Sequence, residues 1–320
     1  MICFVVQAHH QPAHHERLVR TLVADGDVVV THVNASADQS RFAAVPGSSF
    51  TAERVDVHWR GFSQVEATLV LLRTARERHP DASHYWFISG DSYPVRSPGA
   101  LRDMLEADPE RQLINIMPFP APEMGKPENR LSGIWIEHDP RGARRTTTFF
   151  RVLHRITRRP WRRALDGRQP FCGSNWFTLT AGAVDAVLRL SDDRAAFRAF
   201  CGRTVCADEH YFHTLLGETR FLRSTAPAGM FADFTSPQGP WPSQLTEEHV
   251  ERLVGQVPSD ARDGCGRSGS YFARKFTDDT SDALTAAIRE RLWPLPIAAP
   301  ARNPVIDAYV DRQTEGFPLV

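Results

Sequence analysis

The sequence predicts an α/β fold in which a mostly parallel sheet is flanked by helices on both faces. Short apolar segments of strand type alternate with amphipathic helical segments along the first 118 residues. The connections between these segments are short, which is typical of β-α-β units. With 320 residues, the chain is also long enough to bury a large core.

The individual elements follow from composition and periodicity. Runs rich in Val, Ile and aromatic residues predict the strands, which are Ile2–Gln7, Val28–Val33, His84–Ile88 and Gln112–Met117. Apolar residues at helical spacing predict the helices, which are Arg17–Val23, Val65–Ala75 and Gly99–Ala107. Further along, we expect a strand and a helix within Gly173–Val187, helices within Asp208–Leu216, Thr246–Gly255 and Ser281–Leu292, and then a Pro-rich tail that follows the surface.

Charge and composition exclude some classes of protein. Lys plus Arg and Asp plus Glu each total 38, and a net charge of zero argues against a nucleic-acid binder held by phosphate contacts. No apolar run reaches the roughly 18 residues that a membrane-spanning helix needs. The N-terminus has neither the basic region nor the cleavage site of a signal peptide. Five cysteines without metal-ligand spacing fit a reducing, cytoplasmic setting.

In a mostly parallel sheet, ligands bind beyond the carboxyl ends of the strands. This rule singles out three stretches, which are Ala8–His10, Asn34–Ala37 and Gly90–Ser92. Asp91 directly follows a predicted strand and is therefore a candidate ligand-binding carboxylate. A turn that caps the next helix is an equally good explanation of Asp91.

A second candidate lies at the start of the predicted helix Asp208–Leu216. Asp208 is a suitable N-cap, and Glu209 follows in the first turn, where the helix dipole favours an ionised carboxylate. An ionised carboxylate can take a proton from a hydroxyl group. From these residues alone, a plain cap followed by a dipole-stabilising Glu is the commoner explanation.

Lysine is rare in this chain, because Lys126 and Lys275 are the only two among 38 basic residues. Lys275 follows Arg274 between aromatic residues. Arg offers a planar fork and Lys a compact point charge, so the pair suits a polyphosphate. Neighbours on a regular strand point to opposite faces, so both meet one ligand only if the backbone is irregular. The alternative is a pair of snorkelling cations at a domain edge.

Four histidines lie close together near the N-terminus, namely His9, His10, His14 and His15. A helix would bring His10 and His14 together as zinc ligands. Pro12 lies between them and opposes a helix that begins before it. A zinc site is therefore the less favoured interpretation.

The segment Arg144–Arg163 is strongly basic and amphipathic. It suits an anionic membrane surface or an anionic glycan. A solvated helix face is the commoner explanation of such a pattern.

Several motifs occur together in a fixed order. They are Trp59-x-Gly61-Phe62-Ser63, Ser89-Gly90-Asp91-Ser92-Tyr93-Pro94, Gly173-Ser174-Asn175-Trp176-Phe177, Ala207-Asp208-Glu209 and Phe272-Ala273-Arg274-Lys275-Phe276. As an ordered set they resemble the core-2/I-branching family of glycosyltransferases, which also contains the protein xylosyltransferases. The resemblance extends from about residue 1 to residue 280.

This resemblance implies a GT-A-like, Rossmann-like fold with a nucleotide-sugar donor, usually linked to UDP. It also implies an inverting reaction without a metal ion or other cofactor. Glu209 matches the general base, and Arg274 and Lys275 match the cations that stabilise the leaving diphosphate. Among the remaining candidates, His9 and Asp91 are expected on the donor side.

The metal-independent reaction implied by the resemblance agrees with one further feature of the sequence. Metal-dependent GT-A enzymes carry Asp-x-Asp after the strand that corresponds to His84–Ile88, whereas this chain has the single carboxylate Asp91 there. The only Asp-x-Asp of the chain, Asp25-Gly26-Asp27, precedes the second strand. That is the wrong end of the sheet for a ligand, so we interpret it as a turn.

Three positions depart from the family pattern. Asn34 stands where the family usually has an Asp near the uracil or ribose. Arg60 stands where Gly is usual, so the resemblance does not predict the backbone conformation of that loop. Asp233-Phe234 replaces the usual Asp-Trp on the acceptor side.

The acceptor is expected to meet Trp176, Asp208 and Phe234. The aromatic rings would stack on a sugar face, and Asp208 would cap the helix that aims Glu209.

The sequence thus predicts transfer of N-acetylglucosamine or xylose from a UDP-sugar to a hydroxyl of a glycan, glycolipid or peptide. The catalytic domain is expected at 1–245, with a nucleotide-sugar half at 1–118 and an acceptor half at 119–245. Residues 246–320 would complete the diphosphate site and wrap the surface. The enzyme would be cytoplasmic, with a peripheral contact to the inner face of the membrane. A non-catalytic nucleotide-sugar or glycan binder on the same fold is the alternative.

Overall fold

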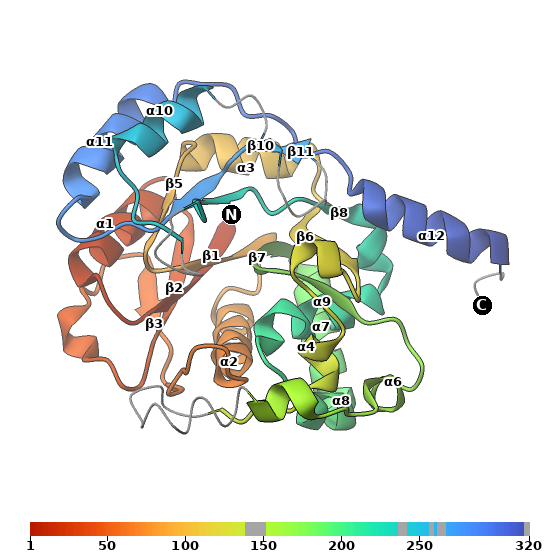
Figure 1. Cartoon of the computed structure of the whole chain (residues 1–320). Helices are drawn as coiled ribbons and strands as arrows, with labels where there is room; N and C mark the ends of the chain where they lie inside the picture. The colour runs from red at the N-terminus through yellow and green to blue at the C-terminus, as the bar shows by residue number, and fades with distance from the viewer. Residues whose placement is uncertain (138–151, 236–241, 256–258, 261–266, 317–320) are drawn as a thin grey trace.

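The computed structural model describes residues 1–137, 152–235, 242–255, 259–260 and 267–316, and its centre is a seven-stranded sheet (Figure 1). The strands are β1 (Ile2–Ala8), β2 (Val28–Val33), β3 (Ser48–Phe50), β4 (His84–Ser89), β6 (Gln112–Pro118), β7 (Phe171–Thr180) and β8 (Thr225–Ala226). Their order is β3-β2-β1-β4-β7-β6-β8. In this sheet β7 alone runs against its neighbours, being antiparallel to β4 and β6. The predicted mostly parallel α/β sheet is confirmed.

Helices cover both faces of the sheet, as predicted (Figure 1). One face carries α1 (Pro12–Val23), α3 (Pro98–Ala107), α10 (Glu247–Gly255) and α11 (Ser281–Arg291), and the other carries α2 (Ser63–Arg78), α7 (Ala181–Asp193), α8 (Ala195–Cys201) and α9 (Tyr211–Gly217). Side chains alternate between the two faces along β1, which explains this arrangement. Phe4 and Val6 pack on the face that carries α1, and Val5 packs on the face that carries α2.

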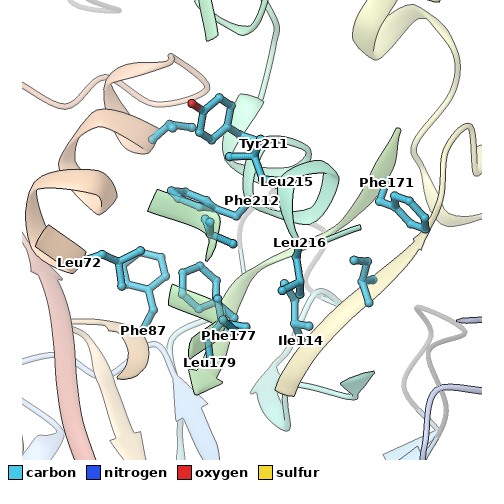
Figure 2. Packing of buried hydrophobic residues seen from close by; sticks show 14 of the residues in the cluster. Leu72, Phe87, Ile114, Phe171, Phe177, Leu179, Tyr211, Phe212, Leu215 and Leu216 are labelled. Atoms are coloured by element: carbon cyan, nitrogen blue, oxygen red, sulfur yellow. The ribbon is translucent and has the colours of Figure 1, made fainter. Parts of the chain in front are cut away.

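Several aromatic rings lie among the aliphatic side chains of the core on the second face (Figure 2). Phe87 of β4 and Phe177 of β7 lie 5.2 Å apart between ring centroids. Phe177 in turn contacts Phe212 of α9 at 5.6 Å. These contacts fix the position of α9 relative to β7, which matters because the segment before α9 carries Glu209.

A three-stranded sheet in the order β5-β12-β9 brings the C-terminal segment to the main sheet. Its strands are β5 (Ser92–Pro94), β9 (Met230–Ala232) and β12 (Phe272–Arg274). β12 pairs antiparallel with β5, and Arg274 lies opposite Ser92. Because β5 begins directly after Asp91, this pairing carries Arg274 to the carboxyl end of β4.

The C-terminal tail differs from the prediction, because it contains the helix α12 (Pro304–Gly316). Asn303 caps this helix by accepting the backbone N–H groups of Val305 and Ile306, at 3.1 and 3.4 Å. Pro304 occupies the first helical position, which is a common place for proline. Asn-Pro is thus a start signal that the Pro-rich composition of the tail concealed.

The described chain also contains several short elements. They are the 3-10 turns η1 (Gln39–Arg41), η2 (Pro122–Met124), η3 (Ala207–Glu209) and η4 (Arg220–Ser224), the helices α4 (Asn129–Ser132) and α6 (Trp161–Ala164), and the strands β10 (Ser259–Asp260) and β11 (Arg267–Ser268). Among the described residues, no helix is both long and apolar enough to cross a membrane.

The Asp-x-Asp stretch is a structural turn at the amino end of the sheet, as predicted. Gly26 has a φ of 86°, a left-handed conformation that suits glycine. The Asp27 carboxylate accepts the N–H of Ile2 at 2.8 Å and pairs with Arg102 at 2.9 Å. Asp27 therefore ties the starts of β1 and β2 together.

The histidine cluster is divided between different environments. α1 begins at Pro12, so His10 lies outside the helix. His14 Nε2 is 2.9 Å from the Ser92 carbonyl oxygen, and His15 Nε2 is 3.0 Å from Thr31 Oγ1. In the described part of the chain, no three His, Cys, Asp or Glu side chains are arranged to hold a metal ion.

We expect the free energy of unfolding to fall as the pH decreases from about 6.5 to about 4. Burial lowers the pKa of His14 and His15 from 6.5 to about 4. Within this range the unfolded chain binds more protons than the folded chain, so acid favours unfolding. The raised pKa of the buried Asp208 carboxyl opposes this trend, but one carboxyl does not offset two histidines. The lowered pKa values of Asp91 and Asp233 affect stability mainly below pH 3.8. Urea denaturation between about pH 7 and pH 4 measures the effect, and a constant free energy would contradict it.

Candidate active site

The three stretches predicted at the carboxyl ends of the strands lie side by side. The backbone N–H of Asn34 donates to the carbonyl of Ala8 at 2.9 Å, and that of Gly90 donates to Gln7 at 2.7 Å. A Cβ on Gly90 would lie 2.9 Å from the Ala8 Cβ, so only glycine fits there without a shift. The ends of β1, β2 and β4 thus form one edge, as the sequence predicts.

Asp91 is buried at this edge and paired with Arg274. Its side chain is 3% exposed, and the Arg274 guanidinium lies 3.3 Å from Oδ1. The Ser89 hydroxyl donates to the same oxygen. Although burial raises the pKa of the Asp91 carboxyl, Arg274, the Ser89 hydrogen bond and Lys275 outweigh it and hold the pKa below its ordinary value. Asp91 is therefore a carboxylate engaged by cations of the C-terminal segment.

Lys275 directly follows Arg274 at the end of β12. β12 ends at Arg274, and the Arg274–Lys275 peptide bond is cis. Because the regular strand ends at Arg274, the alternation that sends neighbouring side chains to opposite faces does not extend to Lys275. Burial, and then the charge of Arg274, lower the pKa of the Lys275 ammonium. No carboxylate of the described residues lies within 4.0 Å of its nitrogen, whereas Arg274 is paired with Asp91.

His9 contributes to the same group of side chains. Its ring packs against His10 with centroids 3.9 Å apart. Removal of the ring from water lowers the pKa of His9 to about 4, and the charges of His10, Lys275 and Arg274 add to this effect. His9 is thus close to both cations and is neutral at pH 7.

Trp176 lies against Arg274, with the guanidinium carbon 4.7 Å from the ring centroid. Two extra residues of β7 bring it there. Ile114 of β6 pairs with Phe177, whereas Ile116 pairs with Gly173, so four positions of β7 oppose two of β6. Such a bulge re-aims side chains and is common beside active sites. Contact of Trp176 with the acceptor stays a prediction, because the structure places its ring beside the expected donor cations.

Gly173 makes this bulge possible, and we expect Gly173→Ala to destabilise the protein by about 3 kcal/mol or more. A Cβ there would lie 1.6 Å from the Asn115 carbonyl oxygen and 2.8 Å from His213 Nε2. Gly99→Ala is the matched control, because its nearest neighbour lies at 4.0 Å and alanine favours the helix α3. Thermal denaturation compares the two, and equal melting temperatures would contradict the steric argument.

Asn34 uses its side-chain amide to join two loops. Its Nδ2 donates to the Val57 carbonyl at 3.1 Å, and its Oδ1 accepts the Val57 N–H at 3.1 Å. Oδ1 also accepts from the backbone of Ser36. Asp could not donate to the Val57 carbonyl, which gives a structural reason for Asn at this position. Contact between Asn34 and a nucleotide stays a prediction.

Glu209 is paired with two cations, Lys126 and Arg130. Lys126 Nζ and Arg130 Nη1 both contact the same carboxylate oxygen, Oε2, the latter at 3.2 Å. The Glu209 side chain remains 25% exposed. The rarity of lysine was the only sequence signal for Lys126, and no signal pointed to Arg130.

The predicted N-cap role of Asp208 is wrong. Asp208 lies inside η3, and α9 begins only at Tyr211, because His210 has a non-helical φ of −131°. The Asp208 side chain is buried, and its Oδ1 has no hydrogen-bond partner in the described structure. Burial, and then the charge of Glu209, raise the pKa of the Asp208 carboxyl. Of the two neighbouring carboxyls, Glu209 is the partly exposed one that is paired with cations.

The loop that carries the Trp59 motif is built without the usual glycine. Arg60 adopts the left-handed conformation with a φ of 68°, which explains why glycine suits this position. The Arg60 carbonyl accepts the N–H of Cys206 at 3.0 Å. This hydrogen bond joins the Trp59 loop to the turn that carries Glu209.

Phe234 is 61% exposed, so its ring is available to a ligand. Its neighbour Asp233 holds α10, since its Oδ2 is 2.9 Å from both His249 Nε2 and Arg252 Nη1. Residues 236–241, next to Phe234, lie outside the described structure. The acceptor role of Phe234 stays a prediction.

The strand β7 connects the two groups of charged side chains. Its Cys172 is close enough to Lys126 and Glu209 for their charges to affect the pKa of the thiol, and its Trp176 contacts Arg274. A carboxylate and a pair of cations thus lie along one strand, at the carboxyl edge of the sheet.

A family model for the core-2/I-branching enzymes matches residues 2–230. The chain belongs to the core-2/I-branching enzyme family. It is therefore a glycosyltransferase, with a nucleotide-sugar donor and a glycan acceptor. The matched residues of this core-2/I-branching enzyme include Asp91, Trp176 and Glu209, whereas Arg274 and Lys275 lie beyond them. None of the curated proteins compared with the chain matches it.

Proposed function

We propose that this core-2/I-branching enzyme is an inverting, metal-independent glycosyltransferase that uses a UDP-sugar, with N-acetylglucosamine or xylose as the sugar. The acceptor is a hydroxyl of a glycan, glycolipid or peptide. The observation that carries the proposal is the arrangement along β7, because the turn η3 that contains Glu209 contacts this strand and Arg274 lies against its Trp176.

In the proposed reaction, the acceptor oxygen attacks the anomeric carbon from the face opposite the diphosphate. The new carbon–oxygen bond forms as the bond to the phosphate oxygen breaks, and its electron pair leaves with UDP. The acceptor's proton passes to Glu209. General-base catalysis of this kind contributes about 10²- to 10⁴-fold in rate.

The leaving diphosphate needs positive charge, and Lys275 and Arg274 are proposed to supply it. Lys275 lacks a carboxylate partner among the described residues, so its charge is available to a phosphate. Asp91 is the only carboxylate in the expected position for a metal ligand, and it is engaged by Arg274 and Ser89. These contacts support binding of UDP by protein cations rather than through a metal ion.

The proposal is tested by calorimetric titration with UDP, GDP and dTDP in EDTA, repeated with added Mn²⁺. We expect UDP to bind in EDTA with an affinity that Mn²⁺ does not change. Binding only in the presence of Mn²⁺ would overturn the metal-independent reaction. Preference for dTDP or GDP would overturn the assignment of the donor and would point to Asn34.

We also propose that the described part of the basic segment, residues 152–163, contacts an anionic membrane surface. Its side chains Val152 and Ile156 are 49% and 69% exposed, and Arg158, Arg162 and Arg163 are exposed beside them. Residues 144–151 of this segment lie outside the described structure. Exposed apolar and basic side chains together suit a lipid surface.

Co-sedimentation with vesicles that contain phosphatidylserine tests this contact. Arg158, Arg162 and Arg163 are replaced by Gln, and binding is expected to fall. Arg159 is kept, because its guanidinium donates to the carbonyls of Leu131 and Phe200 and supports the fold. Unchanged sedimentation of the triple variant would remove the proposed contact.

A further inference from the structure

The geometry around Glu209 points to two further residues that act in the reaction. The ion pairs of Lys126 and Arg130 with Glu209 are both made at Oε2, and no hydrogen bond from a described residue reaches Oε1. A carboxylate held at one oxygen has its other oxygen available to accept a proton. The two contacts therefore orient the Glu209 carboxylate as well as balancing its negative charge.

The two cations are themselves held in place. Lys126 and Ala121 exchange two backbone hydrogen bonds of 3.0 Å, which close the short loop around η2. Arg130 lies on α4 and donates through Nη2 to the Gly125 carbonyl at 3.2 Å. The Lys126 side chain is only 13% exposed and that of Arg130 25%, so water screens their charges less than on an open surface.

We propose that Lys126 and Arg130 are positioning residues that hold Oε2 of Glu209 and direct Oε1 toward the acceptor hydroxyl. This inference rests on the proposed function, because it assumes that Glu209 is the general base. A misplaced base loses rate steeply, on the order of 100-fold for a shift of about 1 Å.

The test replaces Lys126 with Met. We expect kcat to fall by about 10- to 100-fold, while the Kd for UDP stays the same. Lys126→Arg should recover part of the rate, because it keeps the charge. A Lys126→Met variant that folds, binds UDP and keeps its kcat would overturn the proposal.

A matched control exists at the other end of α9. The carboxylate of Glu218 is likewise held at one oxygen, Oε2, by Arg168 at 2.5 Å and Arg194 at 2.7 Å. Arg168→Met removes one cation of this pair outside the site. It is expected to lower stability without a change in kcat.

A chemical measurement separates this inference from the proposed function. Lys126 and Lys275 are the only lysines, so acetylation followed by peptide mass spectrometry monitors each one individually. Glu209→Gln should increase labelling of Lys126 several-fold, because the ion pair is lost, and leave Lys275 unchanged. UDP should protect Lys275 and not Lys126. Unchanged labelling of Lys126 in Glu209→Gln would overturn the ion pair, whatever the variant's turnover.

Discussion

Glu209→Gln should reduce sugar transfer by about 10²- to 10⁴-fold and leave the affinity for UDP unchanged within about twofold. Gln has nearly the same shape but no basic carboxylate, so the acceptor's proton has no recipient. Turnover is measured by UDP release in the presence of acceptor, and affinity by calorimetry. A non-catalytic nucleotide-sugar binder would show no turnover to lose, so this measurement also separates the two functions considered from the sequence.

The control for Glu209→Gln is Glu218→Gln. Both carboxylates are contacted by two cations at a single oxygen, and both lie next to α9, but only Glu209 lies beside β7 residues of the site. Glu218→Gln should lower the melting temperature and retain turnover. If Glu209→Gln retains full turnover while Asp208→Asn loses it, the neighbouring carboxyl is the base and the assignment is wrong.

Replacement of both Arg274 and Lys275 by Ala should weaken UDP binding by about 10²- to 10⁴-fold. Hydrogen bonds to charged groups are worth about 1.5–3 kcal/mol each, and two of them are lost. Lys275→Ala alone is the cleaner variant, because Arg274→Ala also leaves the buried Asp91 carboxylate without its partner. Calorimetry with UDP measures each affinity.

Arg102→Ala is the matched control for this pair. Arg102 also partners a fully buried carboxylate, that of Asp27, but at the amino end of the sheet. Its loss should reduce stability and leave the affinity for UDP unchanged. Unaltered UDP binding by Lys275→Ala would show that the ammonium does not hold the diphosphate.

Much of the fold could be predicted because its signals are local. The strands β1, β2, β4 and β6 and the helices α2 and α3 each have a periodicity that is visible within a short window of sequence. Short connections between them then require parallel strands, and this places Asn34 and Asp91 at one edge. The helix start at Asn303-Pro304 was equally local, but a Pro-rich composition masked it.

The break between η3 and α9 was not predicted, because the residues of Asp208–Leu216 all tolerate a helix. It depends on the contacts of the turn with its surroundings. Cys206, with a φ of 49°, accepts its left-handed conformation beside the loop of Arg60. A cysteine in the sequence gives no signal for a left-handed conformation, so this conformation is decided by packing.

The amino-acid sequence alone determines the sheet, its helical layers, the family and the identity of the residues that can carry charge at the site. Only the tertiary structure decides which of these residues meet. Arg274 reaches Asp91 across 183 residues through the pairing of β12 with β5, and Arg130 reaches Glu209 across 79 residues. The first contact is set by strand register, and both depend on the packing of distant segments, which local periodicity does not encode.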